Sequence, residues 1–117
     1  MKYNYTLYRD PLGSLRIRLP ERIDMFSDFI SLIATEERAN QIIQIIDEVQ
    51  EGKHDEYGIF YNAPTVLIKP EVTSVSLSDI LDDPPPDQYI ETDEFRELIL
   101  IWKEKIPERF LDKDTEE

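Results

Sequence analysis

Carboxylates are the side chains of this sequence with the clearest capacity for chemistry. Residues 79–91 carry Asp79, Asp82, Asp83, Asp87 and Glu91 without an intervening Lys or Arg. Clustered carboxylates can hold a divalent cation, but the spacing lacks the alternating ligands and central glycine of an EF-hand loop. Three prolines at 84–86 also stiffen the segment where such a loop must wrap. The residues favour a surface that attracts a basic partner; a solvated run of charge is the simpler alternative.

Other reactive side chains are scarce. His54 is the single histidine, and Asp55 beside it in sequence is poorly placed to orient it as a general base, so we expect a solvated loop histidine. The absence of cysteine excludes a thiol nucleophile, a disulfide scaffold and a thiolate zinc site. Three glycines form no phosphate-binding loop. The sequence therefore predicts no catalytic residue, metal or cofactor, and a carboxylate–metal hydrolase is the enzymatic alternative.

The charge balance indicates the sign of a partner. Twenty-six Asp and Glu oppose 13 Lys and Arg, giving a net charge of −13. Such a surface repels nucleic acid and anionic membranes and steers basic proteins toward itself. The sole basic concentration comprises Arg9, Arg16, Arg18 and Arg22, which we expect to offset acids within the chain or across an oligomer interface. We therefore expect a basic protein partner and no direct contact with nucleic acid or membrane.

Hydrophobic periodicity indicates the elements that position these residues. Alternation over residues 2–8 and 15–19, around an Asp10–Gly13 turn, predicts a β-hairpin. Apolar residues recur at three- and four-residue steps over 21–33 and again over 39–49, which predicts two helices. Thr35 is placed to cap the second helix, and Gly52 to follow its end.

The second half of the chain alternates again before a final helix. Residues 57–61 and 65–69 predict a second hairpin, residues 72–77 a further strand, and the prolines at 84–86 an extended connection. A last helix is expected from Asp93 to Ile106, with Thr92 as its N-cap. One of its faces is apolar and carries Phe95, Leu98, Ile99, Trp102 and Ile106.

These elements predict an α+β domain. We expect an antiparallel sheet of four to five strands packed by two to three helices, in the order ββααβββα. A chain of 117 residues with 40% hydrophobic residues suits one domain, placed at 1–111, with 112–117 as a flexible acidic tail. No apolar run approaches a membrane span, and the first residues do not form a signal peptide, so a cytoplasmic location is expected.

The end of the sequence resembles a family of small bacterial proteins. Residues 89–102 read Tyr-Ile-Glu-Thr-Asp-Glu-Phe-Arg-Glu-Leu-Ile-Leu-Ile-Trp, after a Tyr-rich first hairpin and a middle sheet. This layout resembles immunity proteins encoded beside contact-dependent growth inhibition toxins and other polymorphic toxins. The resemblance implies a non-enzymatic inhibitor that binds a cognate toxin tightly, often a nuclease with a basic cleft.

The residues expected to contact this partner form two groups. The first comprises Asp79, Asp82, Asp83, Asp87, Tyr89 and Glu91, and the second Asp55, Glu56 and Tyr57. Carboxylates supply steering and specificity, while exposed tyrosines supply buried contact area. Two other functions stay open: an acidic DNA mimic acting on a host nucleic-acid-binding protein, and a regulatory adaptor. The sequence also leaves the oligomeric state open.

Overall fold

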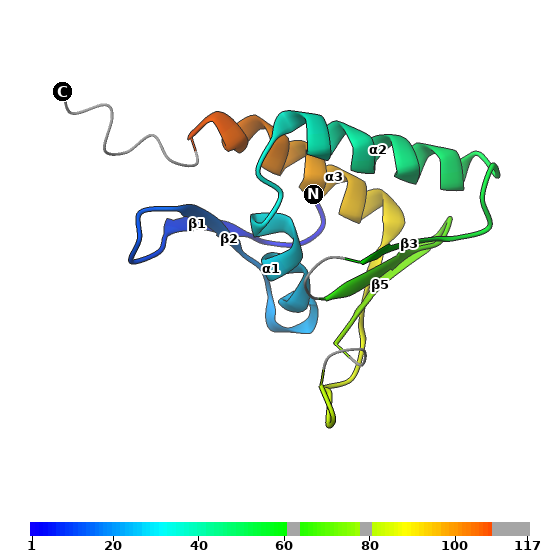
Figure 1. Ribbon diagram of the computed structural model, residues 1–117, viewed down its shortest axis with the longest axis horizontal. Helices are drawn as coiled ribbons and strands as arrows, with labels where there is room; N and C mark the ends of the chain where they lie inside the picture. Colours follow the sequence, from blue (N-terminus) through cyan, green and yellow to red (C-terminus); the bar gives the residue numbers. More distant parts are fainter. Residues whose placement is uncertain (61–63, 78–80, 109–117) are drawn as a thin grey trace.

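The computed structural model describes residues 1–60, 64–77 and 81–108 of the chain. Over these residues the fold is α+β, with a two-stranded and a four-stranded antiparallel sheet and three α-helices (Figure 1). The elements are β1 (Thr6–Arg9), β2 (Leu15–Arg18), α1 (Met25–Ser31), α2 (Glu36–Gln50), β3 (Tyr57–Phe60), β4 (Thr65–Ile68), β5 (Val72–Ser76), β6 (Gln88–Glu91) and α3 (Thr92–Lys105). Short 3₁₀ turns occur at Glu21–Ile23 and Ile106–Glu108. Within the described ranges, no helix is long and apolar enough to cross a membrane.

The first hairpin is confirmed. Strands β1 and β2 pair from Thr6 with Arg18 to Arg9 with Leu15. Asp10 builds the turn, since its Oδ1 accepts from the backbone N–H groups of Leu12 at 2.9 Å and Ser14 at 3.0 Å. Gly13 takes the left-handed conformation, with φ of +87°. The strand begins at Thr6, later than the alternation from residue 2 suggests.

The segment predicted as one helix over 21–33 divides into two pieces. The 3₁₀ turn ends at Ile23, and α1 runs from Met25 to Ser31. The predicted apolar stripe is nevertheless buried, including Phe26, Phe29 and Ile33. Trp102 of α3 donates from its indole Nε1 to the Ile33 carbonyl at 2.9 Å, which satisfies that backbone oxygen where the chain leaves α1.

Helix α2 begins and ends as its sequence predicts. The Thr35 hydroxyl accepts from the Arg38 backbone N–H at 3.0 Å, which satisfies one donor of the first turn. After the last turn, the Lys53 N–H donates to Glu48 O at 2.9 Å and the Gly52 N–H to Val49 O at 3.1 Å. This is a Schellman motif, and Gly52 adopts the φ of +87° that it requires.

The four-stranded sheet has the order β3–β4–β5–β6, and helices cover one of its faces (Figure 1). That inner face carries the buried side chains of Ile59, Val66, Ile68, Val75 and Ile90. They join those of the helices and the first hairpin in one hydrophobic cluster. The expected order lacks β6, which pairs with β5 from Val75–Gln88 to Val72–Glu91. The predicted tail at 112–117 lies outside the described residues.

The prediction that Thr92 caps the last helix is wrong. Thr92 is the first residue of α3, and Glu91 occupies the N-cap position without a side-chain cap hydrogen bond. The buried Thr92 hydroxyl instead donates to the Lys69 carbonyl at 2.6 Å and lies 2.9 Å from the Thr73 hydroxyl. Its role is to join the start of α3 to the turn between β4 and β5.

Candidate protein-binding surface

The first predicted group of acids lies on the connection between β5 and β6. Asp82, Asp83 and Asp87 are exposed there, and the connection projects away from the helices at the bottom of Figure 1. No ion pair joins these three carboxylates to any other residue that the structure describes. Asp79 lies outside the described residues. Tyr89 follows on β6 with 58% of its surface exposed.

The second predicted group lies at the other end of the sheet. Asp55 and Glu56 are exposed and lead into Tyr57, which pairs with Ile68 at one end of the β3–β4 register. The β5–β6 connection instead enters the sheet at Gln88, toward the opposite end of the strands. The aspartates of the connection and the second group therefore lie at opposite ends of the strands and do not form one patch, whereas Glu91, which pairs with Val72, lies at the same end as Tyr57.

Glu91 differs from the other predicted acids because it is bonded within the chain. The Tyr3 hydroxyl donates to its Oε1 at 2.6 Å, and the Lys2 ammonium donates to its Oε2. The Lys2 hydrogen bond and then the Tyr3 hydrogen bond lower the pKa of Glu91 to about 2. Through these two hydrogen bonds Glu91 joins Lys2 and Tyr3 to the start of α3.

The histidine is held beside the second group. His54 Nε2 lies 3.3 Å from Glu48 Oε1, and its ring meets the Tyr57 ring edge-on with 5.8 Å between centroids. Its side chain is 42% exposed. The contact with Glu48 links the loop to α2. Among residues 1–60, 64–77 and 81–108, no three His, Asp or Glu side chains are grouped so that they could hold a metal ion.

Between the aspartates of the connection and the second group lies the outer face of the four-stranded sheet, of which the sequence predicts only Tyr89 and Glu91 as contact residues. Phe60 is 72% exposed and Val72 39%, and the register places Leu67 and Ser74 in one row with Tyr89. These residues alternate with the buried residues of the inner face. The period of two along β3, β4 and β5 was the available signal, since every second residue must point away from the core.

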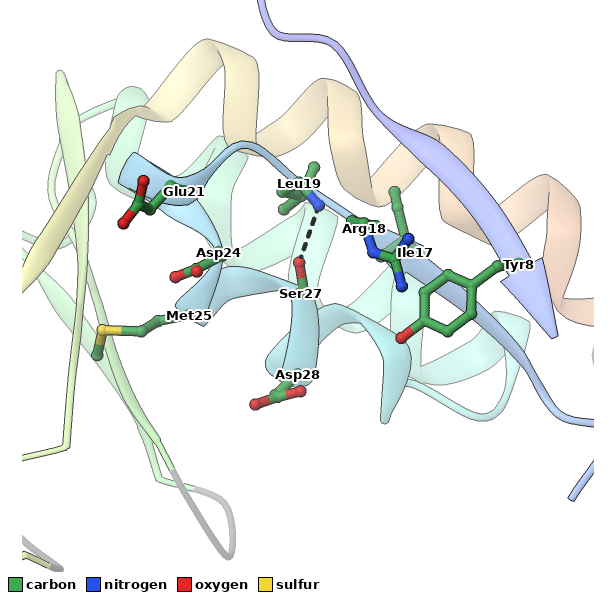
Figure 2. Close-up of a pocket in the computed structure, with 9 residues that line it drawn as sticks. All are labelled: Tyr8, Ile17, Arg18, Leu19, Glu21, Asp24, Met25, Ser27 and Asp28. Atoms are coloured by element: carbon green, nitrogen blue, oxygen red, sulfur yellow. Dashed lines mark hydrogen bonds between the residues drawn. The ribbon is translucent and has the colours of Figure 1, made fainter. Parts of the chain in front are cut away.

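A hollow of about 490 Å³ lies between β2 and α1 (Figure 2). Glu21, Asp24 and Asp28 line it together with Arg18, whose guanidinium lies 4.4 Å from the centre of the Tyr8 ring. The lining contains no histidine. The serine of the lining has a structural hydrogen bond, because Ser27 Oγ accepts from the Leu19 backbone N–H at 3.2 Å. The hollow is thus lined by three carboxylates and one guanidinium, and its serine accepts a backbone hydrogen bond from the residue that follows β2.

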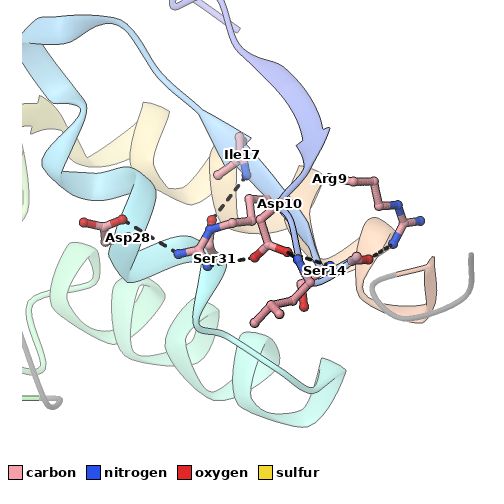
Figure 3. A network of polar contacts seen from close by, with 9 residues as sticks. Arg9, Asp10, Ser14, Ile17, Asp28 and Ser31 are labelled. Carbon is pink, nitrogen blue, oxygen red and sulfur yellow. Dashed lines mark hydrogen bonds and ion pairs between the residues drawn. The ribbon is translucent and has the colours of Figure 1, made fainter.

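The arginines near the first hairpin are engaged within the chain (Figure 3). Arg16 forms an ion pair with Asp10 at 3.5 Å and lies 3.9 Å from Asp28. Arg9 donates to the carbonyl oxygens of Gly13 at 3.0 Å and Glu108 at 2.8 Å. The expected intramolecular offset of charge is confirmed for Arg16, which joins the hairpin to α1.

The structure thus has exposed carboxylates at two ends of the four-stranded sheet, whose outer face carries Phe60, Val72 and Tyr89 as exposed side chains. No family model, curated protein or solved structure matches the chain.

Proposed function

We propose that this chain is a cytoplasmic immunity protein that binds and neutralises a cognate toxin domain with a basic surface. The observation that carries the proposal is the state of five carboxylates, namely Asp55, Glu56, Asp82, Asp83 and Asp87. All five are exposed, and within the described ranges none has an ion-pair partner. Carboxylates left without a cation are free to bind the cations of another protein.

A nuclease is the toxin class that fits this chemistry best. A nuclease must attract phosphates, so its cleft is lined by Lys and Arg, and carboxylates of an inhibitor can occupy the same positions. Complementary charge also accelerates encounter, up to about 10⁸–10⁹ M⁻¹s⁻¹ at low salt. Speed matters for an immunity protein, because free toxin causes damage before binding reaches equilibrium.

The proposal predicts that a toxin domain is encoded beside the gene of this chain, and it is tested by coexpression with that domain. We expect the cells to survive, and the two proteins to copurify as a complex that slows nucleic-acid cleavage in vitro. Cell death without a detectable complex would contradict the proposal. A gene neighbourhood without a toxin, combined with binding to a host DNA-binding protein, would favour the DNA-mimic alternative.

Charge reversal tests the part played by the β5–β6 connection. We expect Asp82→Lys combined with Asp83→Lys to slow association with the toxin domain by about tenfold or more at low salt, because the steering field weakens. The dependence of the association rate on ionic strength should also flatten. Stopped-flow fluorescence over a salt series measures both quantities.

The matched control makes the same change of charge on the helix layer. Glu97 and Glu104 are exposed on α3, so Glu97→Lys combined with Glu104→Lys alters the net charge equally at a distance from the sheet. We expect this control to slow association less. Equal rates for the two double variants would assign the effect to net charge alone and remove the β5–β6 connection from the interface.

A further inference from the structure

We propose that the toxin domain docks on the outer face of the four-stranded sheet, with Phe60 and Tyr89 as its apolar anchors. This inference rests on the proposed function and names the surface that performs it. The face comprises the outward residues of β3 to β6, namely Gly58, Phe60, Thr65, Leu67, Val72, Ser74, Ser76, Tyr89 and Glu91.

The composition of this face is unlike that of the rest of the chain. Only Glu91 among its residues is charged, and that carboxylate is bonded to Lys2 and Tyr3. One third of the whole sequence is charged. A face with one charged residue and exposed aromatic side chains, on such a polar molecule, resembles an interface core, where charged residues are depleted and Tyr and Phe are enriched.

Gly58 shapes the face around Phe60. A Cβ atom at Gly58 would lie 3.3 Å from Cε2 and Cζ of the Phe60 ring and 3.9 Å from Leu67 Cδ1. The ring therefore lies along its own strand, over the glycine, and reaches toward Leu67 on β4. In this arrangement 72% of Phe60 is exposed. A ring already supported by its own strand loses little freedom when a partner covers it.

A hollow at the Tyr89 corner continues the face. It has a volume of about 380 Å³, and its lining includes Tyr89, Val72, Tyr3 and Arg22. Tyr3 is fixed there by its hydrogen bond to Glu91. Energetically dominant contacts gather where a side chain of one protein fills a hollow of the other. Because Lys2 and Arg22 already lie 5.5 Å and 6.0 Å from the centre of the Tyr3 ring, this hollow suits an apolar side chain of the partner.

Charge at the ends of the strands indicates a basic occupant. Glu56 leads into β3, Glu71 into β5 and Asp87 into β6, and all three are exposed; Lys69, after β4, is the cation among the residues flanking these strands. Four strands of four or five residues each cover on the order of 250 Å². A stable interface needs about 800 Å² from each partner. The partner must therefore reach beyond the face, onto these acids.

The experiment uses isothermal titration calorimetry with a catalytically inactive form of the toxin domain encoded beside the gene. We expect Phe60→Ala and Tyr89→Ala each to raise Kd by about 30-fold or more, the size of a hot-spot loss. Ser74→Arg places a cation in the middle of the face, between Leu67 and Tyr89, and should weaken binding at least as much. Circular dichroism and urea unfolding confirm that each variant is folded.

Matched controls are Tyr5, just before β1, and Leu12, in the turn between β1 and β2, which are 37% and 84% exposed. Tyr5→Ala and Leu12→Ala should leave Kd unchanged. Tight binding by the original chain with no loss in the three face variants would overturn the docking face and leave the immunity function standing. Failure of the original chain to bind the toxin domain would overturn both. Sedimentation that shows a dimer lost in the same variants would reassign the face to a second copy of this chain.

Discussion

Glu91 is the residue whose environment departs furthest from what its position in the sequence suggests. Its carboxylate is fixed by Tyr3 and Lys2, and its pKa is lowered to about 2. In the unfolded chain the same group titrates near 4.5. The folded state therefore binds fewer protons, so the stabilisation is present above pH 4.5 and is lost as the pH falls toward 2.

We expect Glu91→Gln to lower the free energy of unfolding at neutral pH by on the order of 1 kcal/mol, since a side chain that is 44% exposed is well screened by solvent. The difference between the original chain and the variant should shrink between about pH 4.5 and pH 2. Urea unfolding followed by fluorescence over this pH range measures it. Glu104→Gln makes the same change at an exposed position on α3 and is the matched control. A constant difference for Glu91→Gln would contradict the assignment.

Among the elements, α3 is held to the sheet by a pair of threonines. The Thr92 hydroxyl has one proton, which it donates to the Lys69 carbonyl, so the Thr73 hydroxyl must donate to Thr92. Both side chains are fully buried. Thr92→Val keeps the shape but leaves the Lys69 carbonyl and the Thr73 hydroxyl without their partner. We expect a loss of about 1–3 kcal/mol in the free energy of unfolding, measured by urea denaturation.

Two further variants separate the hydroxyl from the change of shape. Thr6→Val alters an exposed strand residue of β1 and should be nearly neutral. Combining Thr73→Val with Thr92→Val should lower the free energy of unfolding by less than the sum of the single changes. The reason is that the double variant has no buried Thr73 hydroxyl left without an acceptor. Additive losses would show that the two hydroxyls do not act as a pair.

Local signals in the sequence predict most elements, and distant contacts account for what they miss. Both hairpins, the two ends of α2 and the buried face of α3 follow from periodicity and capping residues. The strand β6 has four residues after three prolines, and its place depends on β5 and on Gln88, which accepts from the Met25 N–H at 2.8 Å across 63 positions. Glu91 is likewise fixed by residues 88 and 89 positions away, which no local pattern reveals.

The candidate site was predictable in part for the same reason. Local composition locates the acids on loops at 55–56 and 82–87, where the structure leaves them exposed. That they lie at opposite ends of one sheet depends on strand order and register, and so does the apolar face between them. The face is composed of two or three residues from each of four strands, and no one of these strands indicates it by its own sequence.

The net charge of the whole molecule should lower the stability of the free protein and, at the same time, speed its association with a basic partner. At about 10 mM salt the Debye length is about 30 Å, comparable with the 49 × 34 × 26 Å dimensions of the molecule, so acids repel one another across it. At about 150 mM it is about 8 Å, and only near neighbours interact. Added NaCl should therefore raise the melting temperature of the free protein while it slows association with a basic toxin domain.

Neutralising two of the exposed carboxylates by mutation should likewise raise stability and slow association. Because Asp82 and Asp83 are exposed and have no ion-pair partner in the described ranges, Asp82→Asn combined with Asp83→Asn relieves repulsion without removing a contact. We expect a melting temperature at least as high as that of the original chain at low salt, with the gap closing at about 150 mM, by scanning calorimetry. The same variant should associate more slowly with the toxin domain. A variant less stable at low salt would mean that these carboxylates support the fold, which would remove them as free ligands for a partner.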